Sequence, residues 1–374
     1  MMYVRRMYAA DHSSGLMIDR SLLGYSFFVS QIWRRCTSLS LQLKITHYYH
    51  SGFSVACDDI LLIFDYWRGE NRELPPERSI TAEELQKYNK VFVMISHEHP
   101  DHYDQDIIYT WREYADVTYI VSYDMPVGTR GKRMSPGDEM DLADGIRLTA
   151  YGSTDLGISF LVDIDGLKIF HAGDLNYWHW RDESTMAEIQ EAEEEFTRKV
   201  RPLSSIGIDI AMFPVDPRQG SMYEAGVNFF ILTAKPRLLI PMHYFHRSDI
   251  IMEYSRLNRT RSTEILAMPG YGDSIAVTRD ENGYIDIRLL RLEGEDITSE
   301  QSIYPVQPDE DPLDPDNPFM ETDLPVMLPD QDILDPVVED PEGTEGLPEN
   351  DDSAAFSEYD PDIEIPEQEN EDGE

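Results

Sequence analysis

The residues with the clearest capacity for chemistry lie in one short segment, Ser96-His97-Glu98-His99-Pro100-Asp101-His102, directly after an apolar run from Val91 to Ile95. His97 and His99 are two positions apart and can point together from an extended segment, while the turn that Pro100 helps to start brings Asp101 and His102 round. Imidazole nitrogens and a carboxylate oxygen form the donor set that borderline divalent metals prefer. The chain has 10 histidines in all, so three in one turn predict a metal site rather than an ordinary loop.

A divalent ion held there would lower the pKa of a bound water toward neutrality, so that hydroxide can act as the nucleophile without a serine or cysteine. The same ion can polarise the carbonyl or phosphoryl oxygen of a substrate. We expect Asp101 to bind the metal and to orient or deprotonate the attacking water. The alternative for Asp101 is a structural helix cap.

The segment from residue 41 to 298 is predicted to form one α/β domain, because short β-rich runs recur with turn residues between them. Tight turns at Gly145, Gly166 and Asn282-Gly283 indicate antiparallel pairs rather than a purely parallel sheet. Sheets in the middle with helices outside, an αββα sandwich, fit this pattern as well as other α/β layers do. The expected strands are 41–46, 53–56, 60–64, 91–96, 118–121, 146–151, 158–163, 167–171, 208–213, 237–241, 274–277 and 284–290, and the expected helices are 104–114, 184–200, 223–233 and 248–258.

The spacing His97-x-His99-x-Asp101-His102 resembles the HxHxDH signature of the metallo-β-lactamase superfamily. Gly173-Asp174 is similar to that family's Gly-Asp, whose carboxylate can bridge two metals, and His243 resembles its last histidine. The stretch His50-Ser51-Gly52-Phe53 resembles the family's opening hairpin. The match covers about residues 41 to 290. It implies an αββα sandwich and a hydrolase with one or two divalent ions, zinc being expected first and manganese or iron being the alternatives.

One departure affects the expected ligands. The family usually has another histidine before the Gly-Asp, but the segment from Gly152 to Gly157 contains none. Asp155 is the candidate replacement, and an oxygen ligand would favour harder metals such as manganese or iron. His171 remains an open candidate, since it can point to the other face of its strand. A single ion at Asp101, His102, Asp174 and His243 is a further alternative.

Other polar and aromatic residues have two interpretations each. His246 is either a proton donor to a leaving group or an ordinary loop histidine. Arg218, next to Asp216-Pro217, is either a ligand for an anionic group or a partner in a structural ion pair. Trp178, His179 and Trp180 either line an apolar pocket or pack in the interior.

Charge and composition divide the chain of 374 residues. The stretch from Glu300 to Glu374 holds 27 of the 72 acidic residues, many prolines and no lysine or arginine. We expect residues 299–374 to be a disordered acidic tail, which either solubilises the protein or binds a protein partner. Residues 1–40 are a poorly defined N-terminal extension. The net charge of −41 makes nucleic acid an unlikely partner, because such a surface repels phosphate.

Three hypotheses for function follow. The first is a hydrolase that attacks an ester, lactone, amide or phosphoester of a small molecule with metal-bound hydroxide. The second is a nuclease or RNA-processing enzyme on the same fold, and the third is a non-catalytic, metal-stabilised interaction protein. Two cysteines fit a reducing compartment, the N-terminal run is a poor signal peptide, and no run is long enough to span a membrane. We therefore expect a cytoplasmic protein, of open oligomeric state.

Overall fold

The computed structural model describes residues 40–180, 183–258, 262–293 and 296–306. Nearly all of the expected N-terminal extension and residues 307–374 of the expected tail lie outside these ranges, so their predicted character stays a prediction. Within the described part of the chain, no helix is both long and apolar enough to cross a membrane.

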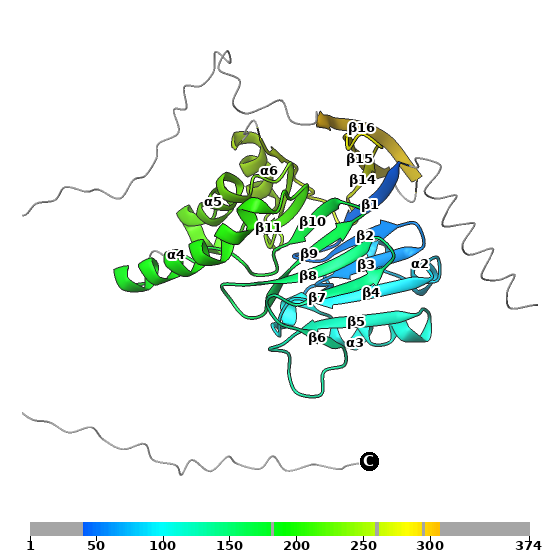
Figure 1. The fold of residues 1–374 in the computed structure, drawn as a ribbon, viewed down its shortest axis with the longest axis horizontal. Coiled ribbons are helices and arrows are strands. Elements are labelled where there is room, and N and C mark those ends of the chain that lie inside the picture. The colour runs from blue at the N-terminus through cyan, green and yellow to red at the C-terminus, as the bar shows by residue number, and fades with distance from the viewer. Residues whose placement is uncertain (1–39, 181–182, 259–261, 294–295, 307–374) are drawn as a thin grey trace, which may run out of the picture. The chain divides into compact units, whose positions relative to one another are not determined.

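Two mixed sheets form the body of the domain (Figure 1). In the first sheet, the strands from β16 through β3 pair antiparallel and those from β3 to β6 pair parallel. Its order is β16 (Asp296–Val306), β15 (Ile285–Glu293), β14 (Ser274–Arg279), β1 (Leu41–His47), β2 (Phe53–Cys57), β3 (Ile60–Phe64), β4 (Lys90–Ile95), β5 (Val117–Ser122) and β6 (Lys132–Met134).

The second sheet repeats this division between parallel and antiparallel pairing. Strands β13 to β10 are parallel, and β10 to β7 are antiparallel. Its order is β13 (Glu264–Ile265), β12 (Leu238–Met242), β11 (Ile210–Pro214), β10 (Leu167–His171), β9 (Ile158–Ile164), β8 (Ile146–Gly152) and β7 (Glu139–Ala143).

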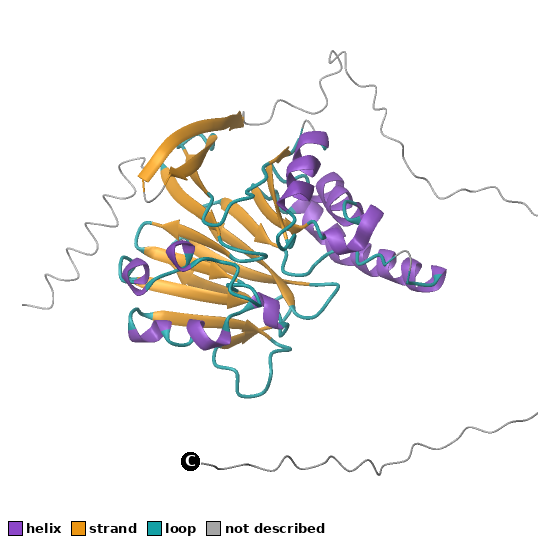
Figure 2. Ribbon diagram, turned by 180° about the vertical axis from the view of Figure 1, so that it is seen from behind, coloured by secondary structure: helices purple, strands orange, loops and turns teal. Residues whose placement is uncertain are grey.

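Short helices cover the outer face of the first sheet, and longer ones cover that of the second (Figure 2). The helix α4 begins at a capping box, in which Thr185 and Glu188 satisfy each other's backbone N–H groups. The α-helices are α2 (Ala82–Leu85), α3 (Gln105–Ile108), α4 (Met186–Val200), α5 (Ala225–Ala234) and α6 (Ser248–Leu257), and the 3-10 turns are η1 (Pro76–Arg78), η2 (Pro100–His102), η3 (Trp111–Glu113), η4 (Arg201–Ser205) and η5 (Pro217–Met222).

Strand β3 shows how the layers are held. Its sequence Ile-Leu-Leu-Ile-Phe is apolar throughout because it is buried on both faces. Leu62 and Phe64 belong to the core between the sheets. There the ring centroid of Phe64 lies 6.2 Å from that of Phe160 in the second sheet. Leu61 and Ile63 point to the other face and pack under the short helices. On the far side, Phe230 of α5 stacks on the second sheet. The architecture is therefore the αββα sandwich.

Most expected strands appear within a few residues of their predicted bounds, but some elements differ. The predicted helix 104–114 is wrong as one element, because it is broken into α3 and η3. Strands β6, β7, β13 and β16 were not predicted; β6 and β13 are only three and two residues long. The final strand β16 runs to Val306, so the expected domain end at residue 298 falls inside it.

Candidate metal centre

The candidate ligands gather at one edge of the sandwich, where the parallel strands of both sheets end. The histidine motif follows β4, Asp174 follows β10 and His243 follows β12. Two loops complete the group, because His50 lies in the turn between β1 and β2 and Asp155 lies between β8 and β9. The carboxyl ends of parallel strands are where binding sites of open α/β sheets form, and here two such edges face each other.

The first cluster consists of His50, Asp101, His102 and His243, whose candidate ligand atoms all lie within 4.8 Å of one another. All except Asp101 are buried; the Asp101 side chain is 25% exposed and lies 3.4 Å from His50 Nε2. Asp101 is therefore the member of this cluster that a substrate or water can reach from outside.

The second cluster consists of His97, His99, Asp155 and Asp174, whose candidate ligand atoms also lie within 4.8 Å of one another. His97 Nε2 is 3.0 Å from His99 Nδ1, and His99 Nδ1 is 3.6 Å from Asp155 Oδ2. His99 and Asp155 are partly exposed, with side chains 42% and 35% accessible. This cluster is the more open of the two.

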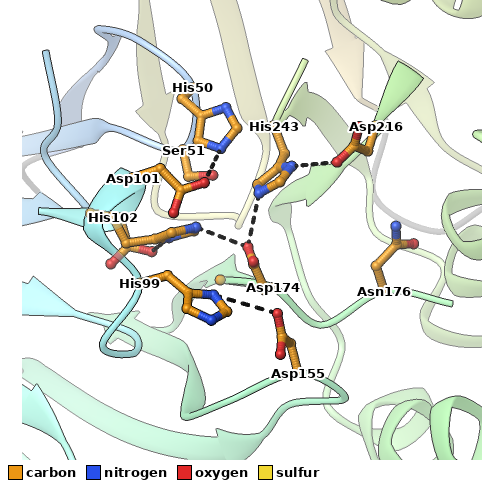
Figure 3. Close-up of polar contacts among 12 residues, drawn as sticks. His50, Ser51, His99, Asp101, His102, Asp155, Asp174, Asn176, Asp216 and His243 are labelled. Atoms are coloured by element: carbon orange, nitrogen blue, oxygen red, sulfur yellow. Dashed lines mark hydrogen bonds and ion pairs between the residues drawn. The ribbon is translucent and has the colours of Figure 1, made fainter. Parts of the chain in front are cut away.

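Asp174 joins the clusters. Its Oδ1 lies 3.1 Å from His102 Nε2 and 3.2 Å from His243 Nε2, whereas its Oδ2 lies 3.5 Å from His97 Nε2. One carboxylate thus presents one oxygen to His102 and His243, as Figure 3 shows, and the other oxygen to His97.

The side chains fit a divalent cation. His102 Nε2, His243 Nε2, Asp174 Oδ1 and both ring nitrogens of His50 are buried and form no hydrogen bond of good geometry among the described residues. The two imidazole nitrogens approach Asp174 Oδ1 only as ion-pair contacts, at 3.1 and 3.2 Å. Buried polar atoms are normally hydrogen-bonded. These atoms converge on one small region and are metal ligands by chemical type, so a cation there would satisfy them together.

Asp65 sets the tautomer of two of these imidazoles. Its Oδ2 accepts from His102 Nδ1 at 2.9 Å and from Ser96 Oγ at 2.7 Å, and its Oδ1 accepts from the Ser96 backbone N–H at 2.8 Å. Because the Ser96 hydroxyl gives its hydrogen to Asp65, its oxygen accepts from His97 Nδ1, 2.9 Å away. His97 therefore carries its hydrogen on Nδ1 and turns its Nε2 lone pair toward the cluster. Asp65 holds the Nδ1 hydrogen of His102 in the same way, so that loss of the second proton, on Nε2, leaves a lone pair facing the cluster.

Asp216 sets the tautomer of His243 as Asp65 sets that of His102. Its Oδ2 accepts from His243 Nδ1 at 3.0 Å, and its two oxygens accept from Arg218. The Asp216 side chain is fully buried, while the Arg218 side chain is half exposed. The carboxylate is thus held between an imidazole that faces the cluster and a guanidinium that faces outward.

The protonation states of the metal-free protein fall into two classes. Burial, with added repulsion from neighbouring imidazoles, lowers the pKa of His50 and of His97 to about 3 each, so both are neutral. Burial alone would also lower the pKa of His102 and His243, but Asp174 and the outer carboxylates outweigh it. They raise the pKa of His102 well above its usual value and that of His243 to about 9. In the metal-free protein, His102 and His243 therefore each carry an extra proton, and these two positive charges lie where a metal cation would bind.

The backbone is strained around these residues. His50, Asp65 and His243 have φ of 54°, 40° and 65°, in the left-handed region. Two glycines permit a close approach of loops. A Cβ on Gly157 would lie 2.0 Å from the Ser96 carbonyl oxygen, and one on Gly173 would lie 2.8 Å from Ser96 Cβ. Backbone strain of this kind is retained where the surrounding structure fixes a functional geometry.

The structure brings together all seven residues predicted as ligands, namely His97, His99, Asp101, His102, Asp155, Asp174 and His243. His50 was predicted only as part of the opening hairpin, and its place in the first cluster was missed. His171 belongs to neither cluster: its Nε2 lies 2.8 Å from the Ser51 carbonyl oxygen, and its ring stacks on Phe64. His246 is exposed. Trp178 donates to the Asp174 carbonyl oxygen and lies 5.7 Å from His243, so it forms part of the wall of the centre.

Comparison with known proteins gives distant relatives. No protein-family model matches the chain. A "UPF0173 metal-dependent hydrolase" of Thermococcus onnurineus is 23% identical over 248 residues, which cover 61% of this chain and 97% of the relative. Another of the same description, from Ignicoccus hospitalis, is 26% identical over 215 residues, covering 54% of this chain and 82% of the relative. The chain is a distant homologue of the UPF0173 metal-dependent hydrolases.

This homology classes the chain with metal-dependent hydrolases, as the histidine motif predicted. The order of the layers is that of the predicted αββα sandwich. Among solved structures, Igni18, described as a metallo hydrolase from Ignicoccus hospitalis, has a TM-score of 0.45 and 20% identity. That similarity covers 63% of this chain and 98% of Igni18.

Proposed function

We propose that the protein hydrolyses an ester, lactone, amide or phosphoester of a small molecule at a centre of two divalent ions. The supporting observation is the position of Asp174, which presents one oxygen to His102 and His243 and the other to His97. A carboxylate shared in this way is suited to two neighbouring cations.

In this proposal, one ion would be held by His50, Asp101, His102 and His243 and the other by His97, His99 and Asp155, with Asp174 available to either. A bound divalent ion supplies a water of lowered pKa and polarises the scissile carbonyl or phosphoryl group. The protein's own residues do the rest. Asp65 and Asp216 fix the imidazoles, and Asp101 would orient the attacking water or accept its proton.

Asp101 suits that role because it is ionised and accessible. Burial alone would raise the pKa of its carboxyl group, but His50, His102 and His243 outweigh burial and lower the pKa below its usual value. Its partial exposure lets it reach a water at the open side of the cluster.

The donor sets suggest which metals bind. Three imidazoles and one carboxylate favour zinc in the first cluster. The second cluster has two imidazoles and two carboxylates, and this higher share of oxygen donors accommodates manganese or iron as well.

We further propose that the substrate is a small molecule rather than nucleic acid, because a net charge of −41 opposes binding of a phosphate backbone. We assign no catalytic role to the acidic segment after residue 306, which is a candidate contact for a protein partner.

The test is metal analysis of the purified protein, followed by assays on a lactone, a carboxylic ester and a phosphodiester. We expect at least one tightly held divalent ion per chain and a turnover that chelation abolishes and added metal restores. Asp101→Asn should lower kcat by about 10²–10⁴-fold, the usual contribution of a positioned base. Asp106→Asn is the matched control, since Asp106 is 86% exposed and lies in the same segment. Turnover that survives exhaustive chelation, or an Asp101→Asn variant as active as the control, would refute the proposal.

A further inference from the structure

Arg218 lies at the rim of the metal centre with part of its guanidinium unused. Nε and the backbone N–H donate to Asp216, as does Nη2, so one edge of the guanidinium is fixed. Among the described residues, Nη1 forms no hydrogen bond. Asp216 is fully buried, but half of the Arg218 side chain is exposed. The pair thus leaves an oriented cationic edge facing outward.

Phe245 supports that edge and connects it to the centre. The guanidinium carbon of Arg218 lies 4.8 Å from the centroid of the Phe245 ring, the arrangement of a cation–π contact. The same ring lies 4.2 Å from the ring of His50 and 5.7 Å from that of His243. The Phe245 ring therefore contacts both Arg218 and the first cluster.

The backbone of Phe245 is in the left-handed region with a φ of 52°, as is that of His243 two residues before it. This conformation is unfavourable for a residue with a bulky side chain. The Phe245 ring nevertheless contacts the rings of both His50 and His243. An arginine that only neutralised Asp216 would not require such a platform.

The charges of the centre also act on Arg218. Burial alone would lower the pKa of its guanidinium, but Asp216, and then the more distant Asp101 and Asp174, raise the pKa above its usual value. Arg218 stays positively charged and lies within the field of two candidate ligands. On a protein of net charge −41, an anion needs such a local cation to bind.

We propose that Arg218, supported by Phe245, binds an anionic group of the substrate, a carboxylate or a phosphate, next to the metal centre. The proposal rests on the proposed function and narrows it: the small molecule to be hydrolysed carries a negative charge close to its scissile bond. Guanidinium groups recognise both kinds of anion through pairs of N–H donors.

The first test measures binding without turnover. Acetate and inorganic phosphate are titrated into the zinc-loaded full-length protein by calorimetry. The variants are Arg218→Gln and, as matched control, Arg247→Gln. Arg247 has a comparably exposed side chain and a similar two-point pair with Asp249. We expect Arg218→Gln to weaken binding of the preferred anion by about tenfold or more, the effect of losing a charge-assisted hydrogen bond. We expect Arg247→Gln to match the wild type.

The preference between acetate and phosphate identifies which anion the rim suits. No saturable binding of either anion, or equal binding by both variants, would overturn the proposal. Metal content is measured in parallel. If Arg218→Gln loses metal, anion binding is measured in Phe245→Leu instead. This variant keeps the ion pair between Arg218 and Asp216 but removes the aromatic ring. Weakened anion binding in Phe245→Leu supports the subsite, and wild-type binding contradicts it.

The second test compares the hydrolysis of two esters of otherwise identical structure. One carries a free carboxylate next to the ester bond, and the other carries the neutral amide in its place. The wild type should prefer the charged ester in kcat/KM, and Arg218→Gln should lose that preference through a higher KM. If neither ester nor any other substrate is hydrolysed while anion binding still depends on Arg218, the proposed function fails and the subsite stands. If both esters are hydrolysed equally by the wild type, the subsite fails and the proposed function stands.

Discussion

Asp65→Asn removes one charge and keeps the shape of the side chain, so it tests whether Asp65 prepares the imidazoles for metal. Asparagine also tolerates the φ of 40° at this position, which separates the electrostatic effect from backbone strain. Three donors point at the two oxygens of Asp65, from Ser96 N, Ser96 Oγ and His102 Nδ1. An amide has one oxygen and one NH₂ group, so it cannot accept from all of them.

Both orientations of the amide carry a cost. With its NH₂ group at the position of Oδ1, the buried Ser96 N–H loses its acceptor, which costs about 1–3 kcal/mol. With the NH₂ group at the position of Oδ2, His102 must accept at Nδ1 and therefore carries its hydrogen on Nε2, where it blocks the metal. The Ser96 hydroxyl is then free to donate to His97 Nδ1, which turns that imidazole into the wrong tautomer as well.

Loss of such a partner behind a metal-bound histidine typically lowers metal affinity about 10–100-fold, which is about 1.4–2.7 kcal/mol. Competition with a chromophoric chelator measures the zinc affinity of the wild type and Asp65→Asn, and circular dichroism checks the fold. Asp209→Asn is the control, because Asp209 is also buried and accepts from a backbone N–H, that of Lys168, but precedes β11 at the other end of the sheet. An affinity of Asp65→Asn within twofold of the wild type, or an equal loss in Asp209→Asn, would refute the reasoning.

Three further predictions follow from the same geometry. Asp155→His should raise the preference of the second cluster for zinc over manganese in competitive metal titrations, and an unchanged ratio would argue against Asp155 as a ligand. Because the pKa of His243 is raised to about 9, metal uptake at pH 8 should release at least one proton into weakly buffered indicator, and affinity should fall with decreasing pH. Gly157→Ala should lower the thermal midpoint much more than Gly128→Ala: both glycines have positive φ, but only at Gly157 would a Cβ collide with the Ser96 carbonyl. Equal losses would contradict the last prediction.

The sequence predicted the part of the site that is encoded locally. His97, His99, Asp101 and His102 lie in one turn, and their residue types and spacing indicate a metal without knowledge of the fold. Asp174 and His243 are single residues at strand ends, and only the resemblance to a family distinguished them from other acidic residues and histidines. Asp155 was found by the absence of a histidine where that family usually has one.

The sequence did not predict the residues whose role depends on contacts between distant segments. His50 is separated by more than 190 positions from His243, yet their ring centroids are 3.9 Å apart. Asp65 and Asp216 follow strands as many other aspartates do, and their hydrogen bonds to His102 and His243 become visible only in the folded chain. The helix predicted at 104–114 is broken because Trp111 is drawn into the core beneath the first sheet, where tertiary packing outweighs helical propensity.

Each of the two clusters draws its residues from both sheets. In the first cluster, His50, Asp101 and His102 come from the first sheet and His243 comes from the second. In the second cluster, His97 and His99 come from the first sheet, whereas Asp155 and Asp174 come from the second. Each ion would therefore connect the two sheets at the end where unpartnered buried atoms and charged groups interrupt the apolar core. Since a ligand that binds only the folded state stabilises it by mass action, we expect ions bound at these clusters to stabilise the packing of the two sheets as well as to serve the proposed chemistry.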